Sequence, residues 1–279
     1  MALVENRNSL DSVKDAERAW HDAHYDAHAA YAYPESVDDF LWVFVKGQIS
    51  RFSDGGWSWW GDARREAIEA LGDVRGLRVL DYGCGYGGLG LYLAYRGARV
   101  WGFDLSPSAI ETANRAAQQY RLPAEFAQMD AAALTYPDEC FDLVVGFGVL
   151  HHVIKYPNAD LHLHRILKPN GRAVFHETLW DNPLLNFARR FTSEHSDAGD
   201  AQLTQRAIRG FCRKFGTVRL EKRHLFYMLK RLGKLPVAGW NSELQPRPLW
   251  RFVKAVDDGI LSVRPLRYFC GEVVIFLQK

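Results

Sequence analysis

Short apolar runs and amphipathic segments alternate along residues 78–177. Apolar runs separated by segments of helical periodicity predict strands joined by crossover helices, an arrangement that builds a parallel sheet. Several runs are almost wholly apolar, as strands covered by helices on both faces should be. The predicted strands are 78–82, 98–103, 124–129, 141–147 and 172–177, and the predicted helices lie within 88–97, 106–120 and 158–171.

Capping residues mark where these helices begin and end. Ser106 followed by Pro107 predicts a helix N-cap and the first helical residue. Gly97 and Gly171 stand where two helices are expected to end, because glycine is the usual residue just past a helix. The helical segments are therefore delimited by local chemistry as well as by periodicity.

The flanking regions follow a different pattern. Residues 217–223 and 269–278 read as a sixth and a seventh strand, and the residues between them look helical and irregular. We expect an α/β fold in which a seven-stranded, mostly parallel sheet has helices on both faces, with a helical segment before it and a helical lid inserted over its ligand-binding edge. The predicted units are a cap at 1–72, the core at 73–224, the lid at 225–264 and the final core strand at 265–279.

Composition narrows the class of protein. The chain has 279 residues, of which 48% are hydrophobic and 24% charged, and a formal charge of +2, so no overall field favours nucleic acid. The chain contains no run of about 18 apolar residues, so no membrane span is predicted. The N-terminal residues lack the apolar core of a secretory signal. The four cysteines are far apart and form no C-x-x-C pair, which favours reduced thiols in a cytoplasmic protein.

A glycine-rich turn after the first predicted strand is the sharpest chemical signal. Gly83, Gly85 and Gly87 allow a tight turn and a close approach of a ligand to the backbone. Asp104 ends the second strand about 20 residues further on, where a carboxylate accepts hydrogen bonds from ribose hydroxyls. Asp81 precedes the first glycine by two and would repel a pyrophosphate, so it favours a ligand with a cationic amino group over a dinucleotide.

Five segments together resemble the class I S-adenosylmethionine (SAM)-dependent methyltransferases in order and spacing. The resemblance covers residues 78–177 well and extends weakly to the last strand. It implies a Rossmann-like sheet, SAM as the cofactor and S-adenosylhomocysteine as the product. The segments are VLDYGCGYGG, GFDLS, QMDAAAL, FDLVVGFGVLHHV and RILKPNGRAVFHE.

The resemblance also implies roles for individual residues at the cofactor. The turn from Gly83 to Gly87, Gly85 included, would wrap the methionine part of SAM, and Asp81 would lie beneath its amino group. Asp104 would hold the ribose hydroxyls. At the adenine we expect Leu105, Asp130 and Ala131, and at the methionine end and sulfonium Gly146 and Phe147.

Four residues near the ends of the fourth and fifth strands are candidates for catalysis. Methyl transfer depends mainly on alignment, and a base is needed only when the acceptor carries a proton. His151 and His152 follow the fourth strand, and His151 is the preferred base because the equivalent position in related methyltransferases tends to face the substrate. His176 and Glu177 end the fifth strand and are further candidates, although all four could instead serve to fix the loops.

The two flanks carry aromatic and basic residues. His21, His24 and His28 have helical spacing, which favours a helix covering the cofactor over a metal site, so no metal is predicted. The basic segment 205–234 reads either as a solvated face or as a surface for an anionic substrate or anionic lipid. Three tryptophans form either core or an aromatic wall for an apolar substrate, namely Trp57, Trp59 and Trp60.

These observations favour a methyltransferase that acts on a small, lipophilic or anionic molecule, with oxygen as the preferred acceptor atom. A protein or RNA methyltransferase is an alternative, although the chain has GFGVLHH after the fourth strand in place of a motif such as NPPY. Another alternative is a relative that keeps SAM without transferring its methyl group, for example a cyclase. The predicted partner is a small molecule, with peripheral membrane contact allowed, and no oligomeric state is predicted.

Overall fold

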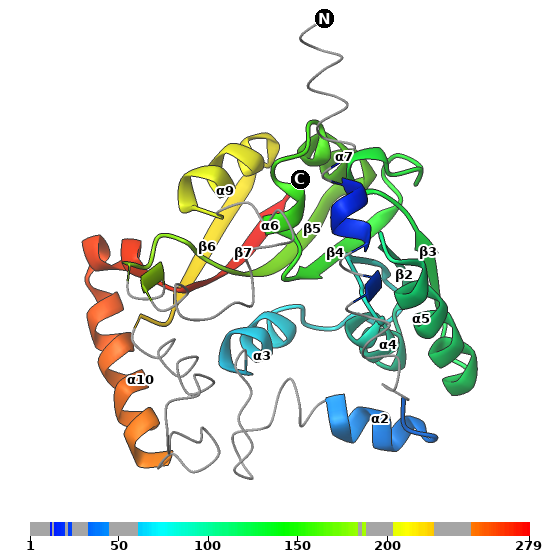
Figure 1. Ribbon diagram of the computed structural model, residues 1–279, viewed down its shortest axis with the longest axis horizontal. Coiled ribbons are helices and arrows are strands. Elements are labelled where there is room, and N and C mark those ends of the chain that lie inside the picture. The colour runs from blue at the N-terminus through cyan, green and yellow to red at the C-terminus, as the bar shows by residue number, and fades with distance from the viewer. Residues whose placement is uncertain are drawn as a thin grey trace, which may run out of the picture.

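The computed structural model describes residues 12, 14–19, 22–23, 33–44, 61–183, 186–187, 203–225 and 247–279 (Figure 1). Several predictions fall outside these residues. They concern the histidines at 21, 24 and 28, the tryptophans at 57, 59 and 60, and positions 226–246 of the predicted lid.

The centre of the molecule is one seven-stranded sheet with the order β3-β2-β1-β4-β5-β7-β6 (Figure 1). The first five strands are parallel, and β7 runs antiparallel to both of its neighbours. The strands are β1 (Arg78–Tyr82), β2 (Arg99–Asp104), β3 (Ala124–Gln128), β4 (Phe141–Phe147), β5 (Leu167–Thr178), β6 (Thr217–Arg223) and β7 (Glu272–Gln278).

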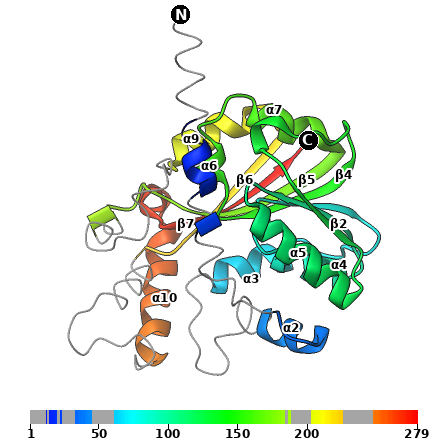
Figure 2. The same cartoon turned by 45° about the vertical axis from the view of Figure 1, so that its right-hand side comes forward.

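Helices cover both faces of this sheet (Figures 1 and 2). The larger α-helices are α2 (Val37–Phe44), α3 (Gly61–Glu69), α4 (Gly88–Tyr95), α5 (Pro107–Tyr120), α7 (Ala159–Ile166), α9 (Gln205–Phe211) and α10 (Arg247–Ser262). The shorter elements are α6 (Leu150–Val153) and the 3-10 helices η2 (Ala131–Ala133), η3 (Cys212–Lys214) and η6 (Arg264–Phe269).

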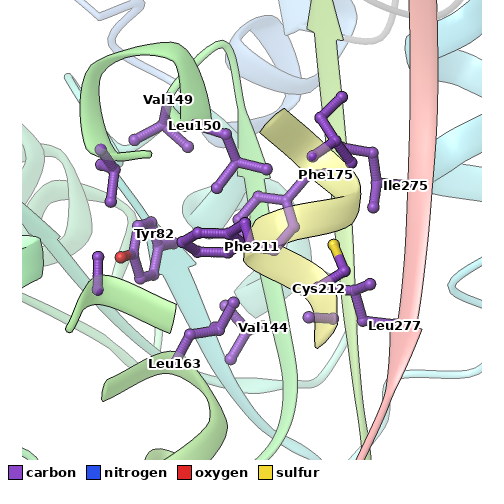
Figure 3. Close-up of a cluster of buried hydrophobic side chains, with 14 of the residues drawn as sticks. Tyr82, Val144, Val149, Leu150, Leu163, Phe175, Phe211, Cys212, Ile275 and Leu277 are labelled. Atoms are coloured by element: carbon purple, nitrogen blue, oxygen red, sulfur yellow. The ribbon is translucent and has the colours of Figure 1, made fainter. Parts of the chain in front are cut away.

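The sheet therefore lies between two apolar layers. On one face, alternate strand residues such as Val79 and Val100 pack with α3 and α4. On the other face, Leu80 and Phe175 pack with residues of α7 and α9. Figure 3 shows this second cluster, in which Phe211 of α9 and Cys212 of η3 lie against the strands that carry Val144, Phe175 and Ile275. The apolar clusters on the two faces thus fix the central strands, and with them the positions of the strand ends.

The strand pattern read from the sequence is confirmed, with small shifts in the boundaries. Strands β1, β4 and β6 have the predicted limits, β5 starts five residues early at Leu167, and β7 starts three residues late at Glu272. Ser106 caps α5, since its side chain accepts a hydrogen bond from the Ala109 amide at 3.2 Å, and Pro107 is the first helical residue.

The prediction that Gly171 ends a helix is wrong. Helix α7 ends at Ile166, and Gly171 lies within β5 after Asn170, whose φ is +61°. A Cβ on Gly171 would stand 2.8 Å from the Lys168 carbonyl oxygen. The glycine is therefore required by a tight backbone turn at the start of β5.

The strand order places a topological switch point between β1 and β4. The chain passes from β1 to β2 on one side and later returns to β4 on the other, so the connecting loops diverge at the carboxyl ends of these two strands. Open α/β sheets bind ligands in the crevice that this divergence creates. Among the helices that the structure describes, none is both long and apolar enough to cross a membrane.

Candidate functional site

A cavity of about 610 Å³ lies at the switch point, a size that suits a small-molecule ligand. Most residues that the sequence singles out for cofactor binding line it, namely Asp81, Gly83, Gly85, Asp104, Leu105, Asp130, Ala131 and Phe147. Gly87 and Gly146 are not among the lining residues, and of the four catalytic candidates only His152 is.

The glycine turn after β1 adopts a backbone conformation that other residues rarely accept. The φ angles of Gly83, Gly85 and Gly87 are +67°, +51° and +81°. A Cβ on Gly83 would stand 2.3 Å from Cγ2 of Val149, so this glycine lets the loop after β4 approach the turn. A Cβ on Gly87 would meet Phe126 at 2.9 Å, so Gly87 serves the packing of α4 rather than the cavity.

Asp81 is a buried carboxylate on the cavity wall. It is 2% exposed and accepts a hydrogen bond from the Gly90 amide in the first turn of α4 at 2.8 Å. Burial raises the pKa of Asp81 to about 7, and the nearby charge of Asp104 acts in the same direction. A buried acid with a raised pKa is stabilised in its charged form by a cation, so this wall favours a ligand with a positive group.

Asp104 is held in place by the glycine turn. Its Oδ2 accepts a hydrogen bond from the Gly85 amide at 2.8 Å, and its Oδ1 accepts one from the Ser106 amide at 3.1 Å. Burial raises the pKa of Asp104 as well. The turn and the end of β2 therefore form one rigid unit, and Asp104 presents its carboxylate to the cavity.

The far end of the cavity is formed by the residues after β3. Oδ1 of Asp130 accepts a hydrogen bond from the Ala132 amide at 2.8 Å, and its Oδ2 forms an ion pair with Nζ of Lys14 at 2.6 Å. Ala131 and Leu105 supply an apolar surface beside this carboxylate. Such a combination suits a flat ring that carries an amino group.

At the end of β4, the two residues expected at the methionine end have different surroundings. Phe147 lines the cavity, and the guanidinium of Arg64 lies 5.6 Å from its ring centre. A Cβ on Gly146 would meet the Phe175 ring at 2.8 Å and the Tyr82 carbonyl oxygen at 2.9 Å. Gly146 is therefore required for packing within the sheet.

Glu177 and His151 form a buried carboxylate–imidazole pair. Oε1 of Glu177 accepts hydrogen bonds from the amides of Val149 and Leu150, both at 2.7 Å, and its Oε2 lies 2.9 Å from Nδ1 of His151. Burial acts to raise the pKa of Glu177, but the His151 side chain and the two amides outweigh it and lower that pKa. Glu177 is thus an ionised group that fixes both the start of α6 and the His151 ring.

The neighbouring His152 lines the cavity, and its ring centre is 4.0 Å from that of His151. Its Nδ1 lies 3.6 Å from a carboxylate oxygen of Glu17, which comes from the N-terminal helical segment. Sequence reasoning missed Glu17, because a single acid in an amphipathic helix carries no sign of its partner. Arg64 in α3 was missed for the same reason.

The remaining candidate, His176, belongs to a different buried cluster. Its Nε2 lies 3.5 Å from Oε2 of Glu272, and Nδ1 of His224 lies 3.0 Å from the same oxygen. Burial lowers the pKa of His176, which favours its neutral form. The cluster joins the ends of β5 and β6 to the start of β7, and the His176 ring packs edge-on against Phe147 of the cavity wall, with 5.8 Å between the ring centres. In the sequence, the sign of this cluster was Glu272, an acid within the apolar run of β7.

Comparisons with known proteins agree with this geometry. Residues 80–175 match a family model described as a methyltransferase domain. A ubiquinone biosynthesis O-methyltransferase from Coxiella burnetii is 32% identical over 142 residues, which cover 47% of this chain and 61% of that protein. A demethylmenaquinone methyltransferase from Thermus thermophilus is 38% identical over 114 residues, 40% of this chain and 51% of that protein. The chain thus spans half to three-fifths of the length of these relatives.

A solved structure shares the fold across most of the chain. The crystal structure of a SAM-dependent methyltransferase from Mesorhizobium loti aligns with a TM-score of 0.52 and 18% identity, covering 80% of this chain and all of that one. The sheet order, the cavity at the switch point and the matched family model lead to the same assignment. Residues 80–175 therefore form a methyltransferase domain, and the sheet has the fold of the SAM-dependent methyltransferases.

Proposed function

We propose that this protein transfers the methyl group of SAM to an oxygen atom of a small, lipophilic molecule. The observation that carries the proposal is the cavity at the ends of β1, β2 and β4, where the carboxylates of Asp81 and Asp104 and the glycine turn that hydrogen-bonds Asp104 form the wall. The names of the two quinone methyltransferases among its relatives support the substrate class, and the name of the ubiquinone biosynthesis O-methyltransferase supports oxygen as the acceptor atom.

The residues present fit SAM along its whole length. Asp81 would accept the amino group, and Arg64 on the same part of the wall would pair with the carboxylate. Asp104 would hold the ribose hydroxyls, and Asp130 beside Ala131 would receive the adenine. Bound there, SAM supplies a methyl group on a sulfonium that is already a good leaving group. Phe147 offers an aromatic face to that positive charge.

We assign the base to His151, which does not itself line the cavity but whose ring centre is 4.0 Å from that of His152, which does. Because Nδ1 faces Glu177, the ring nitrogen left to take a proton from the acceptor hydroxyl is Nε2. The ionised Glu177 would hold the ring orientation and stabilise the imidazolium that forms. His176 is better assigned to the buried cluster with Glu272 than to proton transfer.

The remainder of the cavity supports an apolar acceptor. Besides Phe147, its wall carries the aromatic rings of Tyr33, Phe40, Phe44 and Tyr156. We also propose a reducing compartment such as the cytoplasm, because all four cysteines are free thiols.

Binding and turnover of SAM test this proposal. Calorimetry should show SAM binding, and Asp104→Ala should weaken it by about 1.5–3 kcal/mol because the ribose loses a charged acceptor. Asp138→Ala is the control, since that carboxylate is 73% exposed on the surface. Unchanged affinity in a folded Asp104→Ala protein would contradict the assignment.

Incubation with SAM and a panel of hydroxylated quinones and catechols should then yield S-adenosylhomocysteine and a methylated product by mass spectrometry. We expect His151→Asn to lower kcat by roughly 10²–10⁴-fold. Binding without release of S-adenosylhomocysteine from any acceptor would favour the alternative of a SAM-binding protein that does not methylate.

A further inference from the structure

An N-terminal helical segment lies against the mouth of the cofactor cavity. Its described positions are residues 12, 14–19 and 22–23, and Figures 1 and 2 both show this blue segment beside α6. Three of its side chains contact residues at the edge of the cavity. The contacted residues follow three different strands. The three side chains are those of Lys14, Glu17 and Asp22.

Glu17 makes the most extensive of these contacts. Its carboxylate is 1% exposed and accepts hydrogen bonds from Nζ of Lys155 and the hydroxyl of Tyr156, both just beyond α6. His152 completes the set with its Nδ1 at 3.6 Å. Burial alone would raise the pKa of Glu17, but its three partners outweigh this and lower that pKa, so the group is an ionised carboxylate.

The other two contacts extend the segment across the rim. Lys14 pairs with Asp130 after β3 at 2.6 Å, and Asp22 accepts a hydrogen bond from the Ser106 hydroxyl after β2 at 2.5 Å. The segment therefore spans the ends of β2, β3 and β4. The ends of β2 and β3 are the part of the cavity to which the proposed function assigns the adenosine.

We propose that this segment is the outer wall of the cofactor site and that Glu17 holds it closed, so that SAM enters and S-adenosylhomocysteine leaves only when the Glu17 contacts break. The inference rests on the proposed function, because it takes the cavity to be the SAM site. Glu17 is the main determinant since its charge is buried among three partners, whereas the Lys14 ion pair is partly exposed and contributes less.

Release of S-adenosylhomocysteine measures the closure directly. In stopped-flow displacement from the full chain, we expect Glu17→Ala to raise the dissociation rate at least tenfold, with a matching rise in Kd. Glu17→Gln should show an intermediate increase, because it keeps the shape and loses the charge. Asp15→Ala is the matched control on the same segment, since that side chain is 72% exposed and pairs with Arg18 one helical turn away; its rate should equal that of the wild type.

Hydrogen exchange provides a second readout that does not depend on how well a variant folds. In the wild type, the amides of residues 14–19 should exchange at least tenfold more slowly when S-adenosylhomocysteine is bound. Equal exchange with and without the ligand, or wild-type release rates in both Glu17 variants, would overturn the closure. Absence of any binding by the wild type would instead overturn the proposed function.

Discussion

At the scale of single residues, Asp81 shows a conflict between binding and stability. Its pKa in the folded protein is about 7, whereas an unfolded chain has the ordinary value of 3.8. For an acid whose pKa rises on folding, the stabilising contribution is fully present below the unfolded pKa and is lost as the pH rises through the folded pKa. The unliganded protein therefore carries a destabilising buried charge above pH 7.

We predict that Asp81→Asn makes the unliganded protein more stable at pH 8, by roughly 1–3 kcal/mol. The amide has no charge to bury, and its oxygen still accepts the Gly90 hydrogen bond. Urea unfolding at pH 8 and pH 5 measures the effect. The gain should shrink at pH 5, where the wild-type carboxyl is mostly protonated. If Asp81→Asn were instead destabilised equally at pH 8 and pH 5, burial of the charge would not be costly.

The same group should make SAM binding depend on pH. The amino group of the ligand favours the ionised carboxylate, so the affinity should fall as the pH drops below about 7, approaching tenfold per pH unit. In Asp81→Asn the affinity should be weaker at pH 8 and nearly independent of pH from 6 to 7. Calorimetric titrations across this range, with and without the substitution, compare the two slopes. Parallel slopes would mean that another group is responsible.

At the scale of elements, the glycine turn is constrained by the loop after β4 as well as by its own backbone. A residue with a side chain at position 83 would have to adopt a φ of +67°, and its Cβ would stand 2.3 Å from Cγ2 of Val149. Gly72 provides a matched comparison, because its φ is +74° and nothing lies within 4 Å of an added Cβ. The two positions separate backbone strain from steric obstruction.

We predict that Gly72→Ala costs about 1 kcal/mol of stability, whereas Gly83→Ala costs about 1–3 kcal/mol more because the Val149 loop must move. Gly83→Ala should also abolish SAM binding, while Gly72→Ala should leave it unchanged. Thermal unfolding and calorimetry of both variants give the comparison. Equal losses of stability would place the whole effect in the backbone.

The elements differ in how far the sequence predicts them. Periodicity and caps located all seven strands, because each strand and its crossover helix are determined by local patterns. Gly171 was misassigned, since a glycine that permits a turn and a glycine that ends a helix look alike in sequence. The partners of Glu17 and Glu272 were beyond reach, because long-range contacts between buried polar groups leave no periodic signal.

At the scale of the whole molecule, the proposed cofactor site is assembled from segments far apart in the chain. The glycine turn, the ends of β2, β3 and β4, and the segment that carries Glu17 meet only in the folded protein. The sheet order brings the strand ends together, and so the family resemblance over 78–177 was sufficient to predict most of the wall. The N-terminal wall lies outside that resemblance, which is why its residues were missed.

The place of β7 determines when the sheet can be completed. In the part of the chain that the structure describes, β6 is the edge strand and pairs with β7, which lies between β5 and β6 although it follows both in sequence. During synthesis or refolding, β1 to β5 can associate as they appear, but β6 has to wait unpaired until β7 arrives. Pulse-labelling hydrogen exchange during refolding should therefore show Val218 and Leu220 becoming protected together with Val274 and Ile275, and later than Leu80 and Val144. Protection of β6 ahead of β7 would mean that another contact holds it first.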